Sequence, residues 1–187
     1  MSSELLRVAA FVAYLAAWVV FAGAAIAGMV TRRHRQAVAP VQITMPTIVG
    51  TLLQGSAALA VTLSMRGGAL RPALFELVGA LVLAPLASLV FVWAQFSVPR
   101  DAGAGTLVTG GAYRWLRHPM YLAFLMMLIA TGLLVSTGLK LVAPIALYLW
   151  GSEMRVASEE AELVAQFPEA YAQYRRRTRW RYLPGLR

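Results

Sequence analysis

A short segment before one long apolar run concentrates residue types that can bind an anion. It reads Tyr113-Arg114-Trp115-Leu116-Arg117-His118-Pro119-Met120-Tyr121. Pro119 suits the first position of a helix, because its missing N–H would be unpaired there in any case. The other first-turn N–H groups and the positive end of the helix dipole favour an anion, with Arg117 and His118 beside it. A small carboxylate or phosphate could be held here, although the same residue types also serve as anchors at membrane boundaries.

Carboxylates form a second group further along the chain, at Glu153, Glu159, Glu160 and Glu162. Glu160 shares one predicted helical face with Val156, Leu163 and Phe167, whereas Glu162 falls off that face. An acidic side chain on a buried face needs a partner or a function. Glu159 follows Arg155 by one helical turn and could pair with it, so an ordinary solvated acidic helix remains the alternative.

The two groups carry complementary charges. The first offers a site for an anion, and the second offers carboxylates that could hold an ammonium or sulfonium group. A zwitterionic amino-acid cofactor such as S-adenosylmethionine carries both signs. The pairing of the groups is therefore compatible with such a ligand.

The elements that must position these groups are membrane helices. Hydrophobic residues make up 59% of the 187 residues and charged residues 13%, against about 25% charged in an average soluble domain. A helix of about 20 mostly apolar residues can cross a bilayer. We therefore predict an all-α, polytopic membrane protein with about five transmembrane helices and a C-terminal cytosolic helix. The predicted single membrane domain, 1–187, has spans at about 8–30, 43–65, 73–96, 119–135 and 139–152, a cytosolic loop at 97–118 and a cytosolic tail at 153–187.

The charges predict an orientation for these spans. The net charge is +9, and five spans place most of the 17 arginine and lysine residues on one side, which is normally the cytoplasmic side. The N-terminus is then outside, and both polar groups face the cytoplasm. We expect the inner membrane of a prokaryote, with membrane lipids rather than nucleic acid as partners. The absence of cysteine excludes thiolate chemistry and cysteine metal sites, and no metal is expected.

Two motifs resemble the isoprenylcysteine carboxyl methyltransferase family. Residues 107–114 and Arg117-His118-Pro119-Met120-Tyr121 are similar to the family signature LVTxGPYRxxRHPxYxG. A second motif of the family, EE…L…FGxxYxxY…P, is matched by Glu159, Glu160, Leu163, Phe167, Tyr171, Tyr174 and Pro184, and Trp93 matches a recurrent tryptophan. Ala112, Ala123 and Pro168 stand where the family has proline, glycine and glycine. None of these departures removes a charged or aromatic motif residue.

The resemblance implies an S-adenosylmethionine pocket at the cytoplasmic surface, with a lipid substrate that enters from the bilayer. His118 and the backbone around Leu116–Arg117 would hold the cofactor carboxylate, and Glu159 or Glu160 its amino group. The implied cofactor-binding residues are Tyr113, Leu116, Arg117, His118, Pro119, Tyr121, Glu159 and Glu160. Arg117 and Glu160 are the expected catalytic residues at the reacting end.

The implied function is S-adenosylmethionine-dependent methyl transfer to a lipophilic acceptor, and carboxyl O-methylation of the isoprenylcysteine type is expected. Phospholipid N-methylation stays open. A membrane reductase using NADPH is a further alternative, because sterol reductases share a related C-terminal arrangement, but the paired motifs fit a methyltransferase better. A non-enzymatic membrane protein would leave both motifs unexplained.

Overall fold

The structure is a computed structural model that describes residues 3–35, 44–64, 72–99, 106–136 and 138–185. Its elements are α1 (Ser3–Arg35), α2 (Met45–Leu63), α3 (Leu74–Phe96), η1 (Gly111–Arg114), α4 (Pro119–Val135), η2 (Gly138–Leu141), α5 (Val142–Gln166) and α6 (Pro168–Arg177). No strand occurs within the described segments, so the predicted all-α fold is confirmed.

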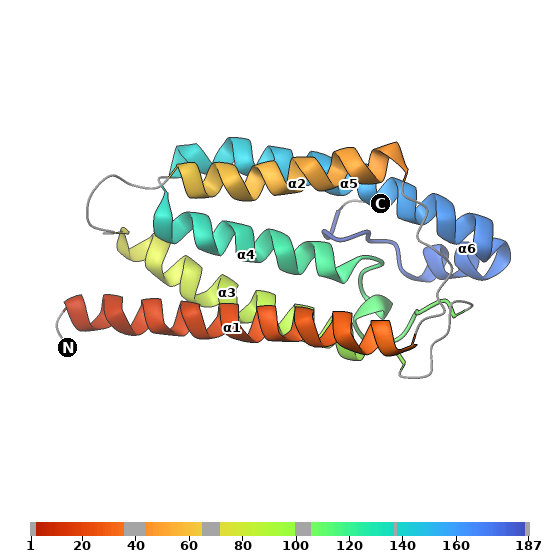
Figure 1. Cartoon of the computed structure of the whole chain (residues 1–187), viewed down its shortest axis with the longest axis horizontal. Helices are drawn as coiled ribbons and strands as arrows, with labels where there is room; N and C mark the ends of the chain where they lie inside the picture. The colour runs from red at the N-terminus through yellow and green to blue at the C-terminus, as the bar shows by residue number, and fades with distance from the viewer. Residues whose placement is uncertain (1–2, 36–43, 65–71, 100–105, 137, 186–187) are drawn as a thin grey trace.

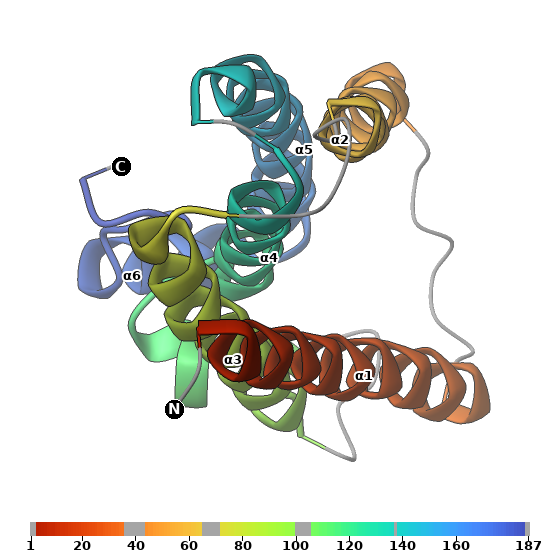
Figure 2. The same cartoon turned by 90° about the vertical axis from the view of Figure 1, so that its left-hand side faces the viewer.

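The long helices form two pairs on either side of α4. α1 packs against α3, and α2 packs against α5. α3 in turn packs against α4, which occupies the middle of the bundle (Figure 1). The view along the bundle in Figure 2 shows α2 with α5 on one side of α4 and α1 with α3 on the other.

Three helical segments are long and apolar enough to cross a membrane: Arg7–Gly28, Met45–Leu63 and Leu74–Phe96. α4 is also apolar but has 17 residues. Large apolar side chains such as Val19, Leu52 and Phe75 point outward, and soluble proteins rarely expose such surfaces widely. The chain therefore fits an integral membrane protein. Crossings by α4 and by the first half of α5 would complete the predicted five, and that number stays a prediction.

α5 joins the predicted span at 139–152 to the polar helix expected in the tail beyond it. It continues from Val142 to Gln166 as one helix of 25 residues. Gly151, at the change in polarity, is buried against α2, where an added Cβ would lie 2.5 Å from the Gly50 carbonyl oxygen. Glycine therefore serves here to bring two helices together, and the rest of the helix carries its acidic residues beyond the apolar part of the bundle.

The chain after α6 folds back towards the bundle and completes the polar end of the molecule. The backbone N–H groups of Arg117 and His118 donate to the carbonyl oxygens of Trp180 and Arg181, at 3.0 and 2.8 Å. The Tyr182 side chain is fully buried beside Tyr121 and Val156. The start of α4, the outer half of α5 and this returning tail are therefore held together as one unit.

Candidate active site

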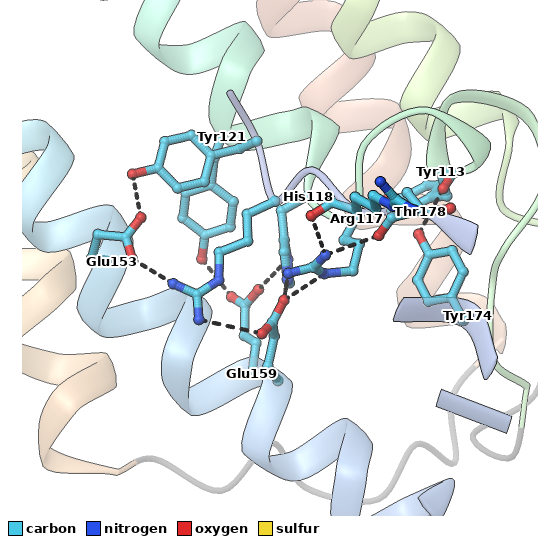
Figure 3. A network of polar contacts seen from close by, with 12 residues as sticks. Tyr113, Arg117, His118, Tyr121, Glu153, Glu159, Tyr174 and Thr178 are labelled. Carbon is cyan, nitrogen blue, oxygen red and sulfur yellow. Dashed lines mark hydrogen bonds and ion pairs between the residues drawn. The ribbon is translucent and has the colours of Figure 1, made fainter. Parts of the chain in front are cut away.

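Arg117 ties the start of α4 to both α5 and the tail. Its Nε donates to Glu160 Oε1 at 2.7 Å, and its Nη1 donates to the carbonyl oxygens of Thr178 and Arg179 at 2.9 and 2.8 Å. Both charged side chains are almost completely buried. Removing one partner of such a pair leaves an uncompensated buried charge, which typically costs about 3–5 kcal/mol. Figure 3 shows this network.

His118 lies between the two adjacent glutamates of α5. Its Nδ1 is 3.3 Å from Glu159 Oε2, and its Nε2 is 3.5 Å from Glu160 Oε1. Burial lowers the pKa of His118, but the two carboxylates outweigh this effect and raise it above its usual value. A protonated imidazole is therefore favoured at this position.

The pKa values of the two glutamates shift in the opposite direction to that of His118. Burial raises the pKa of Glu160, but its contacts with His118 and Arg117 outweigh burial and lower the pKa to about 2. Burial likewise raises the pKa of Glu159, and its contacts with His118, Tyr121 and Arg155 turn the net change downward. Both carboxylates are ionised at neutral pH.

Glu159 also belongs to a group that faces the membrane helices. The Tyr121 hydroxyl donates to Glu159 Oε1 at 2.5 Å, and Arg155 Nη2 lies 3.6 Å from the same oxygen. Arg155 Nη1 donates to Gln54 Oε1 at 3.0 Å, and its guanidinium lies 5.4 Å from the centre of the Tyr121 ring. This group joins α2, α4 and α5.

A separate set of contacts, centred on Glu153, also holds the tail. Arg181 Nη1 donates to Glu153 Oε2 at 2.7 Å, and the Tyr182 hydroxyl donates to Glu153 Oε1 at 2.8 Å. Arg181 Nη2 also lies 3.5 Å from Glu160 Oε2. On the other side of the network the Tyr174 hydroxyl donates to the carbonyl oxygen of Tyr113 at 2.7 Å, which fastens α6 to η1.

A cavity of about 1160 Å³ opens beside these groups. Its polar end is lined by Tyr113, Arg117, His118, Pro119, Tyr121, Arg155, Glu159, Glu162, Gln166 and Tyr174. Its walls then follow α2 through Gln54, Gly55, Ala58 and Val61, and α4 through Phe124, Met127, Leu128 and Thr131. One space thus joins the charged residues to the mostly apolar surfaces of α2 and α4.

The structure brings most of the predicted site residues to this cavity. Tyr113, Arg117, His118, Pro119, Tyr121 and Glu159 line it, whereas Leu116 and Glu160 are not among its lining residues. Glu160 lies behind the wall, paired with Arg117. The resemblance assigned the backbone around Leu116–Arg117 to the cofactor carboxylate. The backbone N–H of Arg117 instead donates to the returning tail, as does that of His118.

Some residues of the site were not among the sequence-predicted set. Arg155 and Glu162 line the cavity, and Arg181 contacts Glu160. The spacing of Arg155 and Glu159 did signal their pairing, which the structure confirms. Gln54 bonds across helices by donating to Ser152 Oγ at 2.9 Å. Arg181 carried no comparable signal, because no periodic pattern links it to α5.

Part of the chain that forms this site has known relatives. Residues 77–165 match the model of the isoprenylcysteine carboxyl methyltransferase (ICMT) family. The resemblance inferred from the motifs is confirmed over this segment, which includes Arg117–Tyr121 and the Glu159-Glu160 pair. Phe167, Tyr171, Tyr174 and Pro184 lie beyond it.

Two curated relatives agree with the ICMT match. The protein-S-isoprenylcysteine O-methyltransferase of Schizosaccharomyces pombe is 36% identical over 72 residues, which cover 38% of this chain and 30% of the relative. The protein of the same name from Xenopus laevis is 38% identical over 73 residues, which cover 38% of this chain and 25% of the relative. The similarity thus spans less than a third of either relative.

Proposed function

We propose that this protein is an S-adenosylmethionine-dependent methyltransferase that acts on a carboxyl group of a lipophilic acceptor at the membrane. The observation that carries the proposal is the single cavity with charges of both signs at one end and apolar walls at the other. The similarity to ICMT proteins supports the same reaction class.

The charged end of the cavity fits the amino-acid part of such a cofactor. His118 and Arg155 offer positive charge to a carboxylate, and Glu159 and Glu162 offer negative charge to an ammonium group. His118 is held between the two glutamates, with Nδ1 3.3 Å from Glu159 Oε2 and Nε2 3.5 Å from Glu160 Oε1, so its positive charge stays at the cavity wall. The cofactor, when bound, supplies an activated methyl group on a sulfonium sulfur.

The protein's task in methyl transfer is alignment rather than proton transfer. A carboxylate acceptor attacks without losing a proton, so it needs no general base, whereas an amine acceptor must first be deprotonated. The lowered pKa of Glu159 and the raised pKa of His118 make both groups poor bases at neutral pH. This pair of shifts favours a carboxyl acceptor over an amine.

We propose that Arg117 and Glu160 act at the end of the site where methyl transfer occurs, and that their roles differ. Arg117 lines the cavity and brings positive charge to its wall, while Glu160 holds the guanidinium in place by accepting a hydrogen bond from Nε. The apolar walls between α2 and α4 suit the hydrocarbon part of the acceptor. From the predicted orientation we infer that the charged end faces the cytoplasm.

Titration of the purified protein with S-adenosylhomocysteine and, separately, with NADPH tests this proposal. We expect S-adenosylhomocysteine to bind with a Kd on the order of micromolar, about −8 kcal/mol. His118→Ala should weaken binding by roughly 1.5–3 kcal/mol, the usual range for a hydrogen bond to a charged group. Methyl transfer to a prenylated cysteine with a free carboxylate should exceed transfer to phosphatidylethanolamine. Binding of NADPH without binding of S-adenosylhomocysteine would support a reductase instead.

A further inference from the structure

A second, smaller pocket lies on the outer side of Arg117. It has a volume of about 350 Å³ and is lined by Arg117, Arg175, Arg176 and Arg179, without a carboxylate. Four guanidinium groups around one small space repel each other unless an anion lies between them. Within the described residues only Arg117 of these four has an acidic partner, Glu160, which does not line the pocket.

The fold gathers these arginines from three places. Arg175 and Arg176 are in the last turn of α6, and Arg179 follows directly after that helix has ended. Arg117 reaches the same place from the start of α4, where its Nη1 donates to the carbonyl oxygens of Thr178 and Arg179. The arrangement depends on tertiary structure and is more than a run of basic residues in sequence.

The hydrogen bonds of Arg117 are incomplete. Nε and Nη1 have partners, but Nη2 is buried and forms no hydrogen bond within the described residues. Arg181 offers a contrast, because it is paired with Glu153 and Glu160. Arg175, Arg176 and Arg179 form no salt bridge in the described part of the chain. A buried guanidinium nitrogen without a partner, beside three arginines without acidic partners, is an arrangement that an oxyanion would satisfy.

We propose that this pocket binds the phosphate of an anionic membrane lipid headgroup. Arginine suits phosphate because its planar fork presents paired N–H donors to the phosphate oxygens. The pocket also lies at the polar end of the bundle, where we expect headgroups. In Figure 1 α6 lies beyond the ends of α1 and α2, and the chain after it turns back towards the bundle.

A neighbouring tryptophan supports this position. Trp115 is 68% exposed, and its segment is fastened to the pocket by a hydrogen bond from Thr178 Oγ1 to the carbonyl oxygen of Arg114. Exposed tryptophan is typical of the membrane–water interface. Basic residues at that interface attract anionic lipids on the cytoplasmic side.

Arg117 links the lipid pocket to the large cavity, because it lines both. A phosphate on its outer side would hold the guanidinium in the position in which Nε binds Glu160. The lipid would thereby favour the arrangement of Arg117, Glu160 and His118 at the cavity wall. This regulatory consequence rests on the proposed function, whereas binding of the lipid itself does not.

Lipid binding is tested directly by native mass spectrometry of the delipidated, detergent-solubilised protein. The probes are phosphatidylglycerol, phosphatidylcholine and inorganic phosphate. We expect phosphatidylglycerol to bind in preference to phosphatidylcholine, and Arg175→Gln, Arg176→Gln and Arg179→Gln each to weaken it about fivefold. Arg177→Gln is the matched control, because Arg177 is exposed in the same helical turn but does not line the pocket.

Three results would overturn the assignment. An equal loss in Arg177→Gln would mean diffuse surface charge rather than a site. Equal binding of the two lipids would show that the pocket does not select an anionic headgroup. Binding of inorganic phosphate as strong as that of phosphatidylglycerol would make free phosphate the ligand. A separate arm measures S-adenosylhomocysteine affinity in phosphatidylcholine nanodiscs with and without phosphatidylglycerol, where we expect tighter binding with the anionic lipid. Selective lipid binding without any binding of S-adenosylhomocysteine would reject the proposed function and leave the lipid site standing.

Discussion

Replacing Glu160 by glutamine removes one charge from a buried cluster and leaves the shape of the side chain almost unchanged. The carboxylate lies 2.7 Å from Arg117 Nε and 3.5 Å from both His118 Nε2 and Arg181 Nη2. Glutamine can still accept one hydrogen bond, but it leaves these cations without their shared counter-charge. We therefore expect Glu160→Gln to destabilise the folded protein.

The size of this effect follows from two observations. The Arg117 and Glu160 side chains are 3% and 7% exposed, and breaking so buried a pair costs about 3–5 kcal/mol. The pKa of Glu160 falls from 4.5 to about 2, and this difference corresponds to roughly 3 kcal/mol of stability at neutral pH. Because the folded-state pKa is the lower one, this contribution is present above pH 4.5 and is lost as the pH falls towards 2. A loss of about 3 kcal/mol at pH 7 is the expected result.

Denaturant titration of the detergent-solubilised protein, followed by tryptophan fluorescence, measures the change in unfolding free energy. Glu162→Gln is the matched control, because Glu162 is on the same helix and forms no salt bridge within the described residues. It should stay within about 0.5 kcal/mol of wild type, as surface substitutions usually do. Wild-type stability in Glu160→Gln would refute the idea that this carboxylate holds Arg117, His118 and the tail together.

Replacement by glutamine at each of the two adjacent positions distinguishes the roles of Glu159 and Glu160. Glu159 is 36% exposed and lines the cavity, so Glu159→Gln should lower S-adenosylhomocysteine affinity with little loss of stability. Glu160→Gln should lower both, because the cations of the cavity wall lose their anchor. Isothermal titration calorimetry on both variants distinguishes these outcomes, and unchanged affinity in Glu159→Gln would exclude it from the cofactor site.

Three further outcomes are expected. Gly55→Leu should raise the KM for the lipid acceptor in steady-state assays, because Gly55 lines the cavity and an added Cβ would meet no atom within 4 Å. Gly23 is equally open but does not line the cavity, so Gly23→Leu is the control and should leave KM unchanged. Equal effects of the two substitutions would argue against an acceptor channel. The unfolding free energy should fall as pH rises above about 6.5, because the folded-state pKa of His118 is raised and its protonated form is the stabilising one. His118→Gln should therefore flatten that part of the pH profile. Superimposable profiles of the two proteins would contradict the pairing of His118 with Glu159 and Glu160. Cysteines placed singly at Ser2 and Gln173 of this cysteine-free chain should label from opposite sides of the membrane, and labelling from one side would exclude five crossings.

The helices could be predicted from the sequence where an apolar run and a clear boundary coincide. The expected range 119–135 has the bounds of α4, because Pro119 starts the helix and the apolar run ends at Val135. The sequence is less informative where polarity changes within one helix. A shift from apolar to acidic residues near Gly151 marks a possible membrane boundary, but it carries no information on whether the helix itself stops.

The site could be predicted in part, for a similar reason. The apolar stripe through Val156 placed Glu160 on a buried face, and the structure finds it buried. The contact between Glu160 and Arg117 spans 43 positions, and only the resemblance to ICMT proteins indicated that the two motifs meet. The return of the tail was not predictable, since Thr178–Tyr182 is an irregular segment held by backbone carbonyls and by Glu153.

The two adjacent glutamates explain why neither sequence motif can form the site without the other. Successive residues on an α-helix differ by about 100° in direction, so Glu159 and Glu160 cannot face the same space. One carboxylate faces the cavity, where Tyr121 and Arg155 contact it. The other faces the tail, where it neutralises Arg117. His118 lies between them and contacts both, so the charge of the cavity wall and the attachment of the tail depend on the same imidazole. A ligand that changes the protonation or position of His118 therefore acts on both at once, and this coupling requires the two glutamates to be neighbours in sequence.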